Sequence, residues 1–178
     1  ADNGSLIVME PQTGKILAMC NTPDFNPNKY NEVESVKDFT NSAISVAYEP
    51  GSIFKPITMS AAIEEKAVTP ETTYQDPGQL KIADFTIYNY DKKSHGLRTM
   101  TQVLEESLNT GVVFASRKIG MEKFTEYVQK FGMGVKAKID MFNEASGNIS
   151  SLNKKHELYM ATASFGQGIM TTPMQMVS

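Results

Sequence analysis

A serine and a lysine stand three residues apart where the sequence predicts the start of a helix, Ser52 and Lys55 in Pro50-Gly-Ser-Ile-Phe-Lys-Pro56. This spacing places both side chains on one helix face, about one turn apart. A serine hydroxyl is a weak nucleophile at neutral pH, and a lysine amine accepts its proton only where its pKa is lowered by burial or a neighbouring cation. The pair therefore predicts a nucleophile, Ser52, with Lys55 as its general base.

A second pair of polar residues, Ser107 and Asn109, lies in Ser107-Leu-Asn-Thr-Gly111, between two predicted helices. A hydroxyl there can relay a proton to a leaving group, and a carboxamide can hold a substrate carbonyl because it both donates and accepts hydrogen bonds. The alternative for this pair is helix capping, for which Ser and Asn are favoured. S-x-x-K alone recurs by chance, so the order of the two motifs, with S-x-N in a helical stretch well after S-x-x-K, carries the catalytic interpretation.

The predicted elements give these residues their positions. Ser5–Glu10 and Lys15–Cys20 read as two strands joined by a turn ending at Gly14, and Ser52 opens a helix that runs to about Lys66. Leu80–Tyr90 predicts a small hairpin around Ala83-Asp84, which we expect to be peripheral. Further helices are predicted over 99–109, where Thr99 and Gln102 form a capping box, and over 112–119, 122–130 and 155–163. A helix beginning at Thr172-Pro173 is expected to be too short to be stable.

Composition restricts the classes of protein that fit. The chain has 178 residues, of which 40% are apolar and 21% charged, and this is typical of one globular domain. A formal net charge of −3 with scattered basic residues argues against nucleic acid as a partner. No apolar run approaches the roughly 20 residues of a membrane helix, and no metal-ligand spacing or cofactor motif occurs, so we predict no cofactor. Because the chain does not begin with Met, we expect a piece of a longer protein.

Four segments together resemble one known family. Ala47-Tyr-Glu-Pro-Gly-Ser-Ile-Phe-Lys-Pro56 is similar to the nucleophile segment of class B penicillin-binding proteins, and Met9-Glu-Pro-Gln-Thr-Gly-Lys-Ile-Leu-Ala-Met19 is similar to their opening hairpin. Ser107–Gly111 resembles the second motif of these peptidoglycan D,D-transpeptidases, and Ser164–Pro173 resembles a stretch upstream of the third. The resemblance covers essentially the whole chain. The use of S-x-x-K with a second and a third motif is a known signature of this group.

The resemblance implies a role for each candidate residue. Ser52 would attack a D-alanyl-D-alanine peptide bond, with Lys55 as general base. Ser107 would help to protonate the leaving amine, and Asn109 would bind the substrate or the side-chain amide of a β-lactam. The implied reaction cross-links peptidoglycan stem peptides through an acyl-enzyme, and β-lactam antibiotics acylate the same serine.

The resemblance also implies a fold and a location. The expected class is α/β of the α+β type, the transpeptidase and serine β-lactamase-like fold with helices around an antiparallel sheet. The parent protein would be bacterial and anchored by an N-terminal membrane helix, with this domain on the outer face of the cytoplasmic membrane. Its partners would be cell-wall synthesis proteins of division or elongation.

One departure from the family is prominent. The third motif, Lys-Thr-Gly or Lys-Ser-Gly on a strand lining the site, does not occur in the sequence. We therefore expect residues 1–178 to be a partial transpeptidase domain, truncated before its last strands and weak or inactive as a catalyst. The opening hairpin would keep an unpaired edge, which favours swapping or homodimerisation.

Three alternatives stay open at this point. The chain can be a β-lactam sensor or a non-catalytic binding module, which would keep Ser52 and Lys55. It can be a D,D-carboxypeptidase or a β-lactamase. It can also be a structural domain in which Ser52 only caps a helix. Tyr48 and Glu49, which flank Ser52 in the segment Ala47–Pro56, are predicted to be a structural brace.

Overall fold

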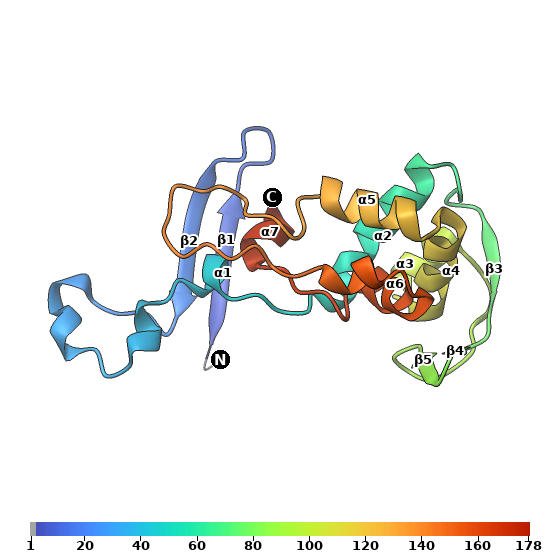
Figure 1. Cartoon of the computed structure of the whole chain (residues 1–178), viewed down its shortest axis with the longest axis horizontal. Helices are drawn as coiled ribbons and strands as arrows, with labels where there is room; N and C mark the ends of the chain where they lie inside the picture. The colour runs from blue at the N-terminus through green and yellow to red at the C-terminus, as the bar shows by residue number, and fades with distance from the viewer. Residues whose placement is uncertain (1–2) are drawn as a thin grey trace.

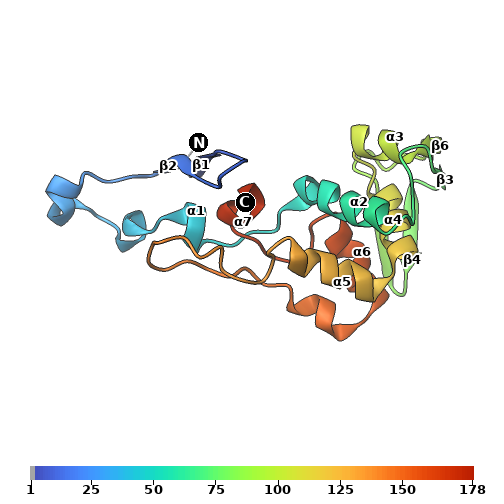
Figure 2. The same ribbon diagram turned by 90° about the horizontal axis from the view of Figure 1, so that it is seen from above.

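The computed structural model describes residues 3–178 and has two parts along its long axis (Figures 1 and 2). One part holds the hairpin of β1 (Gly4–Met9) and β2 (Ile16–Thr22) with the short helices α1 (Ser42–Ser45) and α7 (Pro173–Val177). The other part holds the remaining helices and a set of short strands. The segment after β2 forms two 3₁₀ turns, η1 (Pro27–Glu32) and η2 (Val36–Phe39), which project from the hairpin end.

The predicted opening hairpin is confirmed. Its strands are antiparallel, with Leu6 opposite Cys20 and a bulge between Val8 and Met9, and within residues 3–178 they pair only with each other. Side chains alternate between the two faces of a strand, so the hairpin has two different faces. The apolar side chains of one face are packed against the protein, and those of the other face are exposed to solvent. The inward residues pack on α1 and α7 in a cluster of Ile7, Met9, Met19, Ala43, Ile44 and Met174.

The last helix corrects one expectation. Residues 173–177 were expected to be too short to be stable, yet they form α7 because tertiary contacts replace intrinsic helix stability. Met174 is fully buried against α1, and the predicted start is confirmed by a capping box between Thr172 and Gln175. The Gln175 carboxamide also donates to three backbone carbonyls, those of Gly132, Val135 and Ser146.

The helical part is built on α2 and α4. Its elements are η3 (Gly51–Phe54), α2 (Lys55–Glu64), α3 (Met100–Glu105), α4 (Asn109–Ile119), α5 (Met121–Lys130), η4 (Ser150–Lys154) and α6 (Glu157–Ser164). One apolar cluster joins α2, α3, α4 and β3, and a second joins η3, α5 and α6. The helix predicted from Ser52 opens instead with a 3₁₀ turn, and the helix predicted over 155–163 is formed as α6, which begins two residues later, after the 3₁₀ turn η4. The Thr99–Gln102 capping box is confirmed.

Four short strands between α2 and α3 form two antiparallel ribbons (Figure 1). β4 (Gln79–Ile82) pairs with β5 (Phe85–Tyr88), which confirms the hairpin around Ala83-Asp84, and β3 (Thr73–Asp76) pairs with β6 (Gly96–Thr99). The expectation that this insert is peripheral was wrong. Its apolar side chains pack onto α4 and α6 in a cluster of Ile82, Ile87, Val113, Ala161 and Phe165. The fold is thus mixed α/β, and its strands in residues 3–178 form three two-stranded ribbons.

Candidate active site

Ser52 is exposed in η3, on a turn that the loop after α6 holds in place. The Gly51 amide donates to the Gly166 carbonyl at 2.9 Å. Gly166 has a φ of +78°, and a Cβ there would lie 2.2 Å from the Gly51 oxygen, so only glycine allows this approach of the two backbones. Inside the core, the Thr58 hydroxyl on α2 donates to the Ser164 carbonyl at 2.8 Å. The segment 164–168 therefore fixes the turn that carries Ser52.

Lys55 begins α2 and is almost fully buried, with 2% of its surface exposed. Its Nζ donates to the carbonyl oxygen of Ser107 at 2.6 Å and to the Ser107 hydroxyl at 2.9 Å. Burial lowers the pKa of Lys55 from 10.5 to about 8, because the charged ammonium is desolvated. Within residues 3–178 no carboxylate forms an ion pair with it. About a tenth of the Lys55 amines are therefore neutral and able to accept a proton at pH 7, and the neutral fraction rises above that pH.

Ser107 lies in the turn between α3 and α4 and has a left-handed backbone, with φ at +54°. This conformation is costly for a residue other than glycine. The turn is held by bonds from the Ser107 amide to Leu104 O and from the Leu108 amide to Val103 O. Together they direct the hydroxyl and the carbonyl of Ser107 at the Lys55 amine. The capping interpretation was wrong for Ser107, since α4 starts from Leu108 without a side-chain cap.

Asn109 is the first residue of α4, three residues earlier than the predicted start of that helix. Its Nδ2 donates to the carbonyl of Tyr88 at the end of β5, at 2.8 Å. Helix capping is therefore also wrong for Asn109. The contact joins the S-x-N turn to the insert, and no local pattern in the sequence indicates it.

Three of the four predicted residues, Ser52, Ser107 and Asn109, line one cleft of about 450 Å³. Lys55 lies beneath this cleft, bonded to Ser107, so the structure brings all four together. The hydrogen bonds of the described residues join Lys55 to Ser107 and include none between Lys55 Nζ and the Ser52 hydroxyl. A groove of about 650 Å³ adjoins the cleft and shares Asn109, Phe165 and Gln167 with it.

The residues before Ser52 form the brace that the sequence predicted. Tyr48 pairs with Thr171 through two backbone hydrogen bonds of 2.9 Å, and the Glu49 carboxylate accepts from the Gly168 amide at 2.8 Å. The cleft also contains residues that the sequence analysis missed, Tyr90, Glu106 and Gln167. The sequence could have indicated two of these residues, because Glu106 adjoins Ser107 and Gln167 lies in the segment 164–168.

A family model described as "Penicillin binding protein transpeptidase domain" matches residues 4–178. The chain belongs to this family. Among curated relatives, this transpeptidase chain is 35% identical to stage V sporulation protein D of Bacillus subtilis, over 97% of the chain and 27% of that protein. It is 30% identical to the peptidoglycan D,D-transpeptidase MrdA of Escherichia coli, over 97% of the chain and 31% of that protein. The chain thus spans about a quarter to a third of the relatives it matches, which are class B penicillin-binding proteins.

Solved structures agree with the family assignment. Penicillin binding protein 3 from Mycobacterium tuberculosis, solved in complex with aztreonam, superposes with a TM-score of 0.90 at 30% identity, over 99% of this transpeptidase chain and 39% of that one. A peptidoglycan glycosyltransferase from Burkholderia ambifaria superposes with a TM-score of 0.85 at 25% identity, over 99% and 51% of the two chains. The expected transpeptidase fold is therefore confirmed. Across residues 3–178, no helix has the length and apolar character needed to span a membrane.

Proposed function

We propose that this chain carries the acylation site of a D,D-transpeptidase that cross-links peptidoglycan stem peptides. The observation that supports it most is the buried Lys55 amine, bonded to Ser107 at the base of the cleft that Ser52 lines. A desolvated amine without a carboxylate partner is suited to serve as a base. Family membership supports the same chemistry, since relatives such as MrdA are D,D-transpeptidases.

In the proposed acylation, the neutral Lys55 amine takes the Ser52 proton while the Ser52 oxygen bonds to the carbonyl carbon of D-alanyl-D-alanine. The Ser107 hydroxyl passes a proton to the leaving nitrogen and takes in exchange the proton that Lys55 gained from Ser52, so the terminal D-alanine departs and Lys55 is neutral again. An amine of a second stem peptide then attacks the acyl-enzyme, forms the cross-link and releases Ser52. With a β-lactam, the ring amide opens in the first step and the nitrogen stays attached to the acyl group.

Asn109 is proposed to hold the substrate beside the reacting bond. It lies on the border between the cleft and the adjoining groove, so an acyl donor bonded to Ser52 would pass it on the way out. One carboxamide N–H is committed to Tyr88, and within residues 3–178 the oxygen and the second N–H have no protein partner, so they can meet a peptide group of the substrate.

We further propose that residues 1–178 form the part of a transpeptidase domain that bears the first two motifs. The sequence contains no Lys-Thr-Gly or Lys-Ser-Gly, and the chain spans about a quarter of its relatives. In such a domain the Ser52 amide is one donor to the oxyanion, and the strand that carries the Lys-Thr-Gly or Lys-Ser-Gly motif supplies another. A missing donor lowers the rate by roughly 10²- to 10³-fold, so we expect slow acylation by this chain alone.

The proposed partners are stem peptides and β-lactams, and the proposed place of action is the outer face of a bacterial cytoplasmic membrane. The β-lactam assignment is supported by the aztreonam complex of the Mycobacterium tuberculosis homologue. The location follows from the substrate, because peptidoglycan is cross-linked outside that membrane.

The test is the intact mass of the chain after incubation with benzylpenicillin, beside a Ser52→Ala variant. A stoichiometric mass gain in the parent chain and none in the variant is the expected result. A longer chain that includes a Lys-Thr-Gly or Lys-Ser-Gly segment should be labelled faster by the factor given above. If the longer chain is not labelled, Ser52 is not the nucleophile. Labelling without cross-linking of stem peptides would favour a β-lactam sensor.

A further inference from the structure

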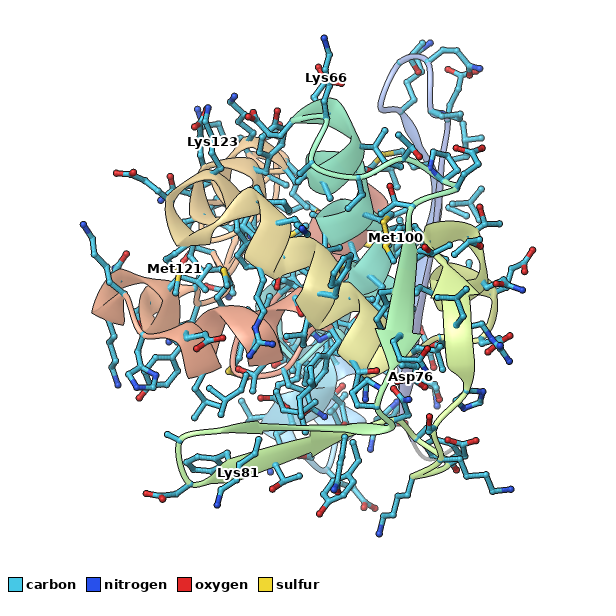
Figure 3. The ribbon with its side chains drawn as sticks, turned by 90° about the vertical axis from the view of Figure 1, so that its right-hand side faces the viewer. Lys66, Asp76, Lys81, Met100, Met121 and Lys123 are labelled. Atoms are coloured by element: carbon cyan, nitrogen blue, oxygen red, sulfur yellow. The ribbon has the colours of Figure 1, made fainter. Side chains whose placement is uncertain are left out.

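Asp76 is a fully buried carboxylate at the end of β3, beside the ribbon of β4 and β5 (Figure 3). Its Oδ1 accepts from the Gly78 amide at 2.9 Å and from the Thr110 hydroxyl at 2.6 Å, and its Oδ2 accepts from the His95 amide at 2.8 Å. The Asn89 Nδ2 donates to both oxygens, at 3.1 and 2.9 Å. No basic side chain of residues 3–178 pairs with it. The buried charge is stabilised by hydrogen bonds alone.

These donors keep Asp76 ionised. Burial by itself would raise the pKa of this carboxyl, but the hydrogen bonds from Thr110, Gly78, His95 and Asn89 outweigh it and hold the pKa below its ordinary value. In all five hydrogen bonds the Asp76 oxygens are the acceptors. A protonated carboxyl group would carry a hydrogen on one of these oxygens, so only the carboxylate can accept all five bonds.

The network continues from Asp76 to the start of α4. Asn89, which Asp76 holds, accepts at its Oδ1 from the amide of Thr110 at 3.2 Å. The single hydroxyl proton of Thr110 is directed at the closer Asp76 oxygen, at 2.6 Å rather than 3.2 Å. The neighbouring Tyr88 carbonyl accepts from Asn109 Nδ2 at 2.8 Å. Two consecutive residues of the insert are therefore paired with two consecutive residues of α4. Asn89 and Thr110 are buried, whereas Asn109 reaches the cleft.

We propose that Asp76 is a positioning residue for Asn109, and that it sets the orientation of the Asn109 carboxamide through Asn89 and the Tyr88 carbonyl. The proposal rests on the proposed function, in which Asn109 holds the substrate. Asp76 itself does not line the cleft. Its effect is therefore confined to ligands that use the Asn109 carboxamide.

The variant Asp76→Asn tests this role with little change in shape. A carboxamide of the same size turns its NH₂ group toward groups that are themselves donors, so part of the network must open. The apolar contacts of the insert with α4 and α6 do not involve Asp76, and they keep the ribbons in place. Asp84→Asn is the matched control, because Asp84 is exposed at the turn of the same insert and loses the same charge.

The first measurement is the side-chain amide signal of Asn109 in a ¹⁵N-labelled chain, assigned with an Asn109→Ala variant. We expect Asp76→Asn to shift this signal and to speed its hydrogen exchange, while Asp84→Asn leaves it unchanged. An unmoved Asn109 signal in folded Asp76→Asn would overturn the proposal. This measurement needs no acylation, so it decides the role of Asp76 even if Ser52 proves inactive.

The second measurement compares two β-lactams. Benzylpenicillin has a side-chain amide for Asn109, whereas imipenem carries a hydroxyethyl group in that place and has no such amide. We expect Asp76→Asn to lower the acylation rate constant on the order of 10-fold for benzylpenicillin and less than about 2-fold for imipenem. In an Asn109→Ala background, Asp76→Asn should have no further effect. Equal losses for both ligands, or full additivity, would show a general structural role and refute the proposal.

Discussion

The two turns that carry the candidate site are held in different ways. The turn of Ser52 is held mainly by backbone contacts, with Gly51 against Gly166 and an isolated backbone bridge between Tyr48 and Thr171. The turn of Ser107 and Asn109 has backbone bonds of its own, but side chains tie it to its surroundings, Lys55 on one side and the Asp76 network on the other. Under the proposed roles, the difference separates functions: backbone contacts hold the proposed nucleophile, whereas polar side chains hold the groups proposed to exchange protons and bind substrate.

The largest effect should come from the group that connects the two turns. Lys55→Met keeps the length and the packing of the side chain and removes the amine. We expect the acylation rate by benzylpenicillin to fall about 10³-fold, since a general base contributes this order of magnitude. Lys81→Met, on the exposed face of β4, is the control and should acylate normally. A Lys55→Met chain that acylates at the parent rate would remove Lys55 from the mechanism.

The next effect tests the backbone side of the comparison. Gly166→Ala places a methyl group against the Gly51 backbone and also strains a positive φ, so we expect a loss of about 3 kcal/mol in the free energy of unfolding together with slower acylation. Gly132→Ala has the same φ of +78° but meets nothing within 4 Å, so it should lose only about 1 kcal/mol. Urea denaturation of both variants measures the difference. Equal losses would show that the contact with Gly51 contributes nothing.

The sequence could predict the features that depend on neighbouring residues, but not the contacts between residues far apart in the chain. The hairpin, the Thr99 capping box and the Ser52–Lys55 spacing are local signals, and the structure confirms the elements that they indicate. The Asp76 network joins residues 34 positions apart, and no local pattern marks such a partner. Strands β3 and β6 have four residues each, too few for a clear alternation, and were missed. The sequence left the capping alternative for Ser107 open, because a helix cap and a turn that directs a hydroxyl at an amine use the same residue types.

A smaller effect is the pH dependence that Lys55 imposes. The amine acts when neutral, so acylation of the free chain should rise about tenfold per pH unit below pH 8 and level off above it. The same shift affects stability. Between pH 8 and 10.5 the unfolded chain holds a proton that the folded chain has released, so the free energy of unfolding should rise with pH in this window.

The Lys55→Met variant separates this cause from others. Stopped-flow acylation rates and denaturation midpoints, measured from pH 6 to about pH 10.5, should lose both trends in the variant. A rate that stays flat through pH 8 in the parent chain would show that Lys55 does not titrate as the base.

The smallest effect is expected at the brace before the nucleophile. Glu49 accepts one hydrogen bond from the Gly168 amide, at a site open to solvent, and water can replace much of such a bond. Glu49→Gln keeps an acceptor oxygen, so we expect less than about 1 kcal/mol of lost stability and an acylation rate within about 2-fold of the parent chain. Glu49→Ala removes the acceptor and should cost more than Glu49→Gln without changing the pH midpoint of acylation. A shifted midpoint in either variant would give Glu49 an electrostatic role toward Lys55, and the turn of Ser52 would then depend on side-chain charge as the turn of Ser107 does.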